Sequence, residues 1–207
     1  FKLPLRPSRR LLLDLVSHPG WCWHMLCHGG PQLKNLAVSS NARENITEQA
    51  SALSRQMDLA LSWNDVTWLR RHWRGRIVIK GIQGLADARR AQAHGVDGIV
   101  LSNHGGRQLE SAPCPLEVLP EVAAELGQSL EILVDGGVRR GSDIAKAVAL
   151  GARAVLLGRA PLYGLAGRGP AGANEVLAIL RTELDNTLRL LGRNRIGALD
   201  AAAVRKR

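Results

Sequence analysis

The sequence predicts an α/β protein built around a parallel β-sheet. Four short segments are apolar along most of their length, at residues 76–81, 97–103, 131–137 and 153–159, and each is followed by a stretch of helical periodicity. Strands that lack a polar face are typical of parallel sheets covered by helices. The chain therefore reads as four consecutive βα units.

The residues ahead of the first strand have a different character. The segment RLLLDLVSHPGWCWHMLCHG predicts one or two helices broken at Pro19, whereas residues 31–56 are polar and rich in loop formers. Ser62 and Asp65 have the spacing of a capping box, which predicts a helix leading into the first strand. We therefore divide the chain into a helical and loop lead-in, residues 1–75, and a sheet region, residues 76–207.

The helices of the sheet region are predicted from apolar periodicity and from their end signals. We expect them at residues 85–95, 115–127, 142–151 and 173–191. In the third of these helices, Ser142 is the expected N-cap and Gly151 the expected terminator.

Composition narrows the class of protein. The 207 residues are 45% hydrophobic, which is enough for a substantial core, and no apolar run approaches the roughly 18 residues of a membrane span. Three cysteines are an odd and sparse set, typical of a reducing compartment, so a cytoplasmic location is expected. The cluster WCWHMLCHGG matches no usual zinc spacing, and no metal site is predicted.

A net charge of +10 raises the question of an anionic partner. The arginines are scattered in short clusters, and no nucleic-acid-binding motif accompanies them. We therefore expect no nucleic-acid partner. Individual arginines are instead candidates for binding the carboxylate or phosphate groups of small molecules.

Polar residues gather where each predicted strand ends. Lys80 and Gly81 end the first strand, residues 102–107 the second, residues 135–139 the third, and residues 158–159 the fourth. In a (β/α)₈ barrel and in an open doubly wound sheet alike, ligands bind at the carboxyl ends of the strands. Either architecture makes these residues neighbours.

Two chemistries are combined at these strand ends. Arg107 can hold a carboxylate with its planar fork while the imidazole of His104 works on the adjacent carbon. Glycines beside arginines at 136–139 and 158–159 favour a phosphate site, although tight βα turns alone would explain the glycines. Lys80 needs an anionic or electron-rich partner, and a salt bridge to a neighbouring strand is the simpler alternative to a ligand.

The segments VIKGI, GIVLSNHGGRQLE and LVDGGVRRGSDIAKAVALGARAVLLGRAPLYGLA resemble the FMN-dependent 2-hydroxy acid oxidase and dehydrogenase family. This family includes glycolate oxidase and lactate dehydrogenase, and the segment RLLLDLVSHPGW most resembles its mandelate dehydrogenase branch. The resemblance implies a TIM (β/α)₈ barrel. Since four βα units are present, we expect the chain to be the carboxyl-terminal half of that barrel, a fragment or truncated form of a longer enzyme.

The resemblance also implies roles for individual residues. His104 would be the catalytic base and Arg107 the clamp for the substrate carboxylate. The residues that would contact FMN are Lys80, Ser102, Asp135, Gly136, Gly137, Val138, Arg139, Gly158 and Arg159.

The implied reaction is the oxidation of a small 2-hydroxy acid of the lactate, mandelate or glycolate class to the 2-oxo acid. Quinone, cytochrome and oxygen remain alternative electron acceptors. The full-length form is expected to be a homo-oligomer and to lie at the periphery of the inner membrane, with its membrane-contacting loop largely upstream of Phe1. The alternatives are a non-catalytic FMN- or phosphate-binding fragment and a half barrel that needs a partner.

Overall fold

The structure, a computed structural model, describes residues 8–29 and 58–205. The chain forms two compact units, Phe1–Leu61 and Ser62–Arg207, and each is described by itself. The second unit begins at Ser62, ahead of the boundary drawn at residues 75/76 from the sequence. The stretch 31–56, expected to be loop-rich, lies outside the described residues.

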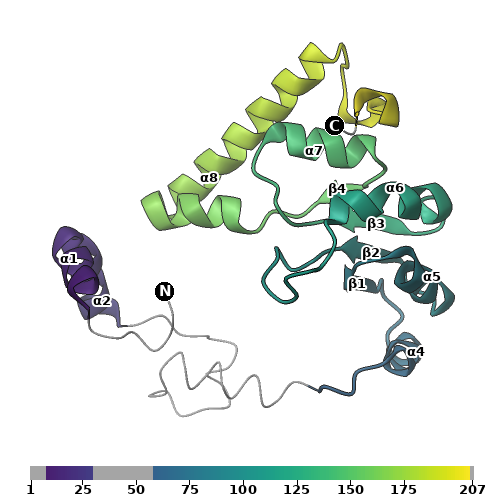
Figure 1. Ribbon diagram of the computed structural model, residues 1–207, viewed down its shortest axis with the longest axis horizontal. Coiled ribbons are helices and arrows are strands. Elements are labelled where there is room, and N and C mark those ends of the chain that lie inside the picture. The colour runs from purple at the N-terminus through teal and green to yellow at the C-terminus, as the bar shows by residue number, and fades with distance from the viewer. Residues whose placement is uncertain (1–7, 30–57, 206–207) are drawn as a thin grey trace. The chain divides into compact units, whose positions relative to one another are not determined.

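The second unit contains a four-stranded sheet in the order β1-β2-β3-β4 (Figure 1). The strands are β1 Val78–Ile82, β2 Gly98–Leu101, β3 Glu131–Val134 and β4 Ala154–Val155. Each strand pairs in parallel with its sequence neighbour, so that Lys80, Val100, Leu133 and Ala154 form one row across the sheet. The predicted series of parallel strands is confirmed.

A helix follows every strand. These helices are α5 Leu85–Ala93, α6 Pro115–Leu126, α7 Gly141–Ala149 and α8 Arg159–Leu190. The core lies between the helices and the outward-facing strand residues Ile99, Leu101, Ile132 and Val134, which are at most 2% exposed. On the opposite face of the sheet Val78, in the outer strand β1, is 49% exposed, whereas Val100 in β2 is 4% exposed.

Three sequence-based boundaries were wrong. Helix α7 begins at Gly141 with Arg140 as N-cap instead of Ser142, because the Asp143 carboxylate accepts hydrogen bonds from the N–H groups of Arg139 and Arg140. Helix α8 begins at Arg159 and not near residue 173, but non-helical backbone at Arg168 and Gly169 divides it, and the helix expected from residue 173 corresponds to its second part. Gly158 and Arg159 therefore lie at a helix start and not in the fourth strand.

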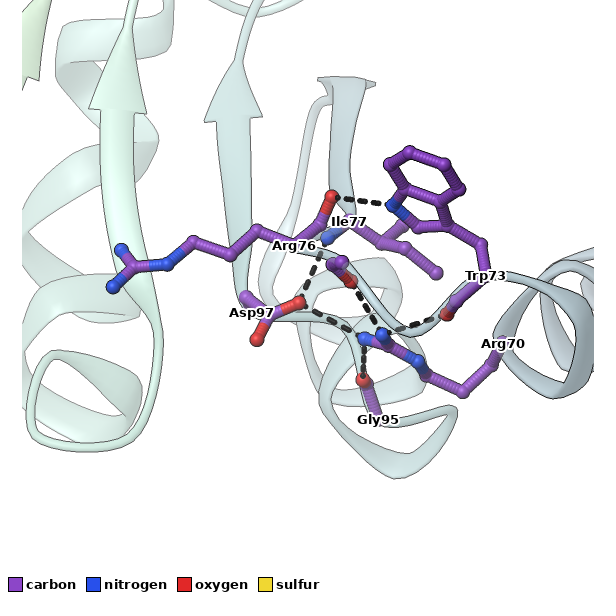
Figure 2. Close-up of polar contacts among 7 residues, drawn as sticks. Arg70, Trp73, Arg76, Ile77, Gly95 and Asp97 are labelled. Atoms are coloured by element: carbon purple, nitrogen blue, oxygen red, sulfur yellow. Dashed lines mark hydrogen bonds and ion pairs between the residues drawn. The ribbon is translucent and has the colours of Figure 1, made fainter.

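Arg70 of helix α4, Trp63–His72, bonds to the amino-terminal end of the sheet (Figure 2). The Arg70 guanidinium donates to Asp97 Oδ2 at 2.9 Å and to the Trp73 carbonyl at 2.9 Å. Asp97 Oδ2 also accepts from the Ile77 N–H at 2.7 Å. The predicted capping box is present, because Asp65 Oδ2 accepts from the Ser62 N–H at 2.7 Å.

The described part of the first unit consists of α1, Arg9–Ser17, and α2, Pro19–His28. The predicted break at Pro19 is confirmed, since Pro19 is the first residue of α2. Neither helix contains a buried residue. No helix in the described ranges is both long and apolar enough to cross a membrane.

Candidate active site at the carboxyl ends of the strands

Three side chains from three neighbouring strand ends meet around the Lys80 ammonium group. Lys80 Nζ lies 2.8 Å from Ser102 Oγ and 2.7 Å from Asp135 Oδ2. Ser102 is completely buried, and the Asp135 side chain is 17% exposed. The register of β1, β2 and β3 explains the cluster, because it brings the carboxyl ends of the three strands to one level. The salt bridge considered as an alternative for Lys80 therefore exists, and it lies within the predicted site.

The second carboxylate oxygen of Asp135 is buried without a partner. Among the described residues nothing donates a hydrogen bond to Asp135 Oδ1. A buried acceptor without a donor costs free energy, and in native proteins such atoms mark places where a ligand or water binds. A ligand hydroxyl or N–H group at this position would remove the cost.

His104 follows β2 in an unusual backbone conformation. Its φ is +55°, and no other non-glycine residue of the described ranges has a positive φ. The Ser102 hydroxyl accepts a hydrogen bond from the His104 N–H at 3.1 Å, which connects the Lys80 cluster to the histidine. The imidazole lies close to Gly81, where an added Cβ would be 3.2 Å from His104 Cε1.

Arg107 is exposed on the same loop. Within the part of the chain that the structure describes, its guanidinium makes no hydrogen bond or ion pair. The structure thus places Arg107 within three residues of His104 but joins the two side chains by no direct contact. The Arg107 guanidinium group is therefore available to bind a carboxylate.

Arg159 connects the fourth strand end to the histidine loop. Its Nη2 donates to the Gly105 carbonyl at 3.0 Å, across 54 residues of sequence. Arg159 is predicted from the sequence to bind phosphate, and this second contact was not foreseen. No local pattern signals such a contact, since it depends on how the ends of β2 and β4 are placed.

The amino ends of α7 and α8 differ in the hydrogen-bonding groups that they leave free. At α7, Asp143 accepts from two N–H groups and the Glu183 carboxylate accepts from the Gly141 N–H at 2.8 Å. The hydrogen bond from the Gly141 N–H, together with one from the Arg140 guanidinium to Glu183 Oε1 at 2.9 Å, holds the pKa of Glu183 below its ordinary value. Helix α8 has no side-chain cap at Gly158. The amino end of α8 is therefore the better placed of the two to receive an anion.

Glycines leave room between these helix starts and the Asp135 carboxylate. Gly136 and Gly137 have φ of +95° and +72°, and a Cβ at Gly137 or Gly158 would meet no atom within 4 Å. Val138 is half-buried, whereas the Arg139 side chain is exposed beside the glycines. The predicted residues 135–139 and 158–159 therefore form an open, positively charged surface next to the Lys80 cluster.

A separate cleft of about 820 Å³ lies at the other end of the strands. Its charged lining residues are Arg76, Asp97, Glu131 and Arg153. Asp97 is held by Arg70, and Glu131 lies 3.6 Å from Arg153, so these charges are largely used within the protein. We place the candidate site at the carboxyl ends, where the buried acceptor and the free guanidinium lie. No group of three potential metal ligands occurs within residues 8–29 and 58–205.

The strand-end contacts place a candidate ligand site at the carboxyl ends of a parallel α/β sheet, and comparison with known proteins identifies the family. The model of the FMN-dependent dehydrogenase family matches residues 1–206. The chain belongs to this FMN-dependent family, as the sequence resemblance implied.

Individual relatives agree with this assignment. The (S)-mandelate dehydrogenase of Pseudomonas putida is 47% identical over 93% of this chain and 48% of its own length. A putative L-lactate dehydrogenase of Mycobacterium tuberculosis is also 47% identical, over 92% of this chain and 44% of its own length. The crystal structure of a monotopic membrane protein, (S)-mandelate dehydrogenase, covers all of this chain and 54% of its own with a TM-score of 0.90 at 45% identity. The chain thus spans about half the length of the relatives that it matches, and its four βα units correspond to part of a TIM barrel.

Proposed function

We propose that this chain provides the carboxyl-terminal half of an FMN site at which a 2-hydroxy acid is oxidised to the 2-oxo acid. The observation that carries the proposal is the Lys80, Ser102 and Asp135 cluster, in which Asp135 Oδ1 has no partner among the described residues and the Ser102 hydroxyl accepts from the His104 N–H. Relatives named mandelate and lactate dehydrogenase support the same class of substrate.

The residues present fit an FMN molecule. Asp135 Oδ1 would accept from a ribityl hydroxyl group, and the chain from Gly136 to Arg139 would lie along the ribityl phosphate. Gly158 and Arg159 at the uncapped start of α8 would complete the phosphate site, because helix N-termini favour anions. Lys80 and Ser102 would contact the flavin ring, where the ammonium group stabilises negative charge. FMN, when bound, supplies the acceptor for two electrons.

The protein's own groups handle the substrate. Arg107 would bind the substrate carboxylate through two parallel N–H···O hydrogen bonds. His104 would take up a proton as the C–OH group becomes C=O, a change that removes two electrons and two protons from the acid. Hydride and carbanion descriptions of this oxidation both use His104 as the base.

The test uses the full chain titrated with FMN and then mixed anaerobically with L-lactate or (S)-mandelate, while flavin absorbance is recorded. We expect FMN binding in the micromolar range and bleaching by the acid. His104→Ala should keep FMN and lose on the order of 10²–10⁴-fold in the rate of bleaching. His72→Ala, which changes an exposed histidine of α4, is the matched control.

Two results would contradict parts of this proposal. Tight FMN binding without bleaching in the unmodified chain would leave a non-catalytic flavin-binding fragment, the alternative considered from the sequence. Bleaching at an undiminished rate in His104→Ala would remove His104 from the reaction.

We further propose that the first unit attaches the protein to a membrane surface through α1 and α2. These helices expose apolar side chains that are 56–80% accessible, namely Leu12, Leu13, Val16, Trp21, Trp23 and Leu26. Arg9 and Arg10 begin α1 and would face anionic headgroups. This differs from the expectation that the membrane-contacting loop lies upstream of Phe1. The similar crystal structure of a monotopic membrane protein, (S)-mandelate dehydrogenase, which covers this whole chain, supports the assignment.

Vesicle sedimentation tests the attachment. The full chain should sediment with anionic phosphatidylglycerol vesicles more than with phosphatidylcholine vesicles, and added salt should weaken the binding. The double variant Trp23→Asp, Leu26→Asp should remain in the supernatant, whereas Leu177→Asp, at an exposed position of α8, should not. Equal sedimentation of all three proteins would rule out α1 and α2 as the contact.

A further inference from the structure

The loop after β2 contains three consecutive residues in the left-handed region. His104, Gly105 and Gly106 have φ of +55°, +67° and +71°. Glycine adopts this conformation freely, but a residue with a Cβ does so at a cost in free energy. The conformation of His104 must therefore be imposed by its surroundings.

Asn103 makes the contacts that hold this turn. Its Oδ1 accepts a hydrogen bond from the Gly106 N–H at 3.2 Å, and its backbone carbonyl accepts from the same N–H at 3.0 Å. Its Nδ2 donates to the Pro113 carbonyl at 3.3 Å. The amide also lies against the end of β3, since a Cβ at Gly136 would be 3.3 Å from Asn103 Oδ1.

The backbone conformation of residues 104–106 places the His104 ring next to β1. The His104 ring faces Gly81, directly after Lys80 in β1, because a Cβ added at Gly81 would lie 3.2 Å from His104 Cε1. On the other side of the residue, the Ser102 hydroxyl fixes the His104 N–H. The imidazole is thus held next to the Lys80 cluster by contacts of its backbone, and no side-chain hydrogen bond of its own contributes in the described part of the chain.

We infer that Asn103 is a positioning residue for His104. By joining Gly106 to the Pro113 segment, the Asn103 amide keeps residues 104–106 left-handed and so directs the imidazole toward the substrate side of the Lys80 cluster. The effect of the imidazole's placement on the reaction rests on the function proposed above. The placement of the His104 imidazole next to Gly81 is a property of the chain and can be measured without FMN.

The first measurement is a nuclear Overhauser effect between His104 Hε1 and the Gly81 Hα protons in the full chain labelled at histidine and glycine. His104→Gln identifies the cross-peak. We expect the cross-peak in the unmodified chain, its loss in Asn103→Ala, and a reduced intensity in Asn103→Asp, which keeps an acceptor for Gly106 but loses the donor to Pro113. Asn186→Ala, which changes an exposed asparagine of α8, should leave the cross-peak unchanged.

The second measurement is the reaction with a 2-hydroxy acid in the FMN-loaded chain. Asn103→Ala should bind FMN normally, show little change in KM because Arg107 is untouched, and lose kcat on the order of 100-fold. Asn103→Asp should lose less. A rise in KM with kcat retained would make Asn103 a substrate contact and overturn its positioning role.

The two proposals can fail separately. No bleaching in the unmodified chain would remove the proposed function, while the cross-peak still decides the positioning of His104. Absence of the cross-peak in the unmodified chain, or its persistence in both Asn103 variants, would overturn the inference. If Asn103→Ala does not fold, Asn103→Asp alone tests the inference. An undiminished cross-peak between His104 and Gly81 in Asn103→Asp would then contradict it.

Discussion

Gly81 separates Lys80 from the imidazole of His104, and it is suited to this place for two reasons. Its φ is +98°, and a Cβ would lie 3.2 Å from His104 Cε1. Gly81→Ala should therefore lower the free energy of unfolding by about 1–2 kcal/mol through backbone strain, and it should also displace the imidazole. Urea unfolding and the rate of flavin bleaching measure the two effects. Gly197→Ala is the control, because its φ is not positive and a Cβ there meets no atom within 4 Å; equal stability of the two variants would contradict the argument.

At the scale of elements, α7 and α8 pack so closely that Gly141 is needed between them. A Cβ at Gly141 would collide with the α8 backbone at Glu183 and Leu184. Gly141→Ala should separate the helices, break the Gly141 to Glu183 hydrogen bond, and cost about 1–3 kcal/mol of stability. Thermal unfolding measures this cost, and an unchanged melting temperature would show that α8 moves aside freely.

The attachment of α4 should depend on acid. Hydrogen bonds from the Ile77 N–H and from Arg70 hold the pKa of Asp97 below its ordinary value of 3.8. Because the folded carboxyl binds its proton less readily than the unfolded one, its stabilising effect is complete above pH 3.8 and is lost as the pH falls through the lower, folded value. Hydrogen exchange at the Ile77 amide should therefore accelerate in this acid range. In Asp97→Asn the exchange should not respond to pH beyond its intrinsic dependence, and a response equal to that of the unmodified chain would exclude Asp97 as the cause.

At the scale of the whole molecule, each outer strand of the sheet has one edge that pairs with no other strand of the described residues. In the described part of the chain β1 pairs only with β2, and β4 pairs only with β3. Open edges next to exposed apolar side chains such as Val78 favour pairing with another chain. Sedimentation velocity should show association that increases with concentration, and Val78→Lys should weaken it, whereas Leu165→Lys on α8 should not. A monomer at every concentration would contradict this prediction.

Much of the fold could be predicted because its signals are local. Apolar runs of four to eight residues followed by helical periodicity locate each βα unit, and polar residues mark where each strand ends. Helix boundaries were less predictable. Helix α7 begins at Gly141 with Arg140, rather than Ser142, as N-cap, and the start of α8 was missed because Gly169 and Pro170 interrupt its pattern. The error at α7 arises because a short segment can satisfy several capping arrangements, and the error at α8 because glycine and proline are typical of helix ends.

The sequence by itself determined the order of the βα units, the polar strand ends and, through its motifs, the family. Only the tertiary structure decided which of these residues meet. In the structure Lys80 contacts Ser102 and Asp135, and one Asp135 oxygen has no partner among the described residues. Arg159 donates a hydrogen bond to the Gly105 carbonyl, and Asn103 accepts one from Gly106 in the His104 turn. The physical reason is that periodicity and capping act within a few residues, whereas these contacts join strand ends that only sheet register and helix packing bring together.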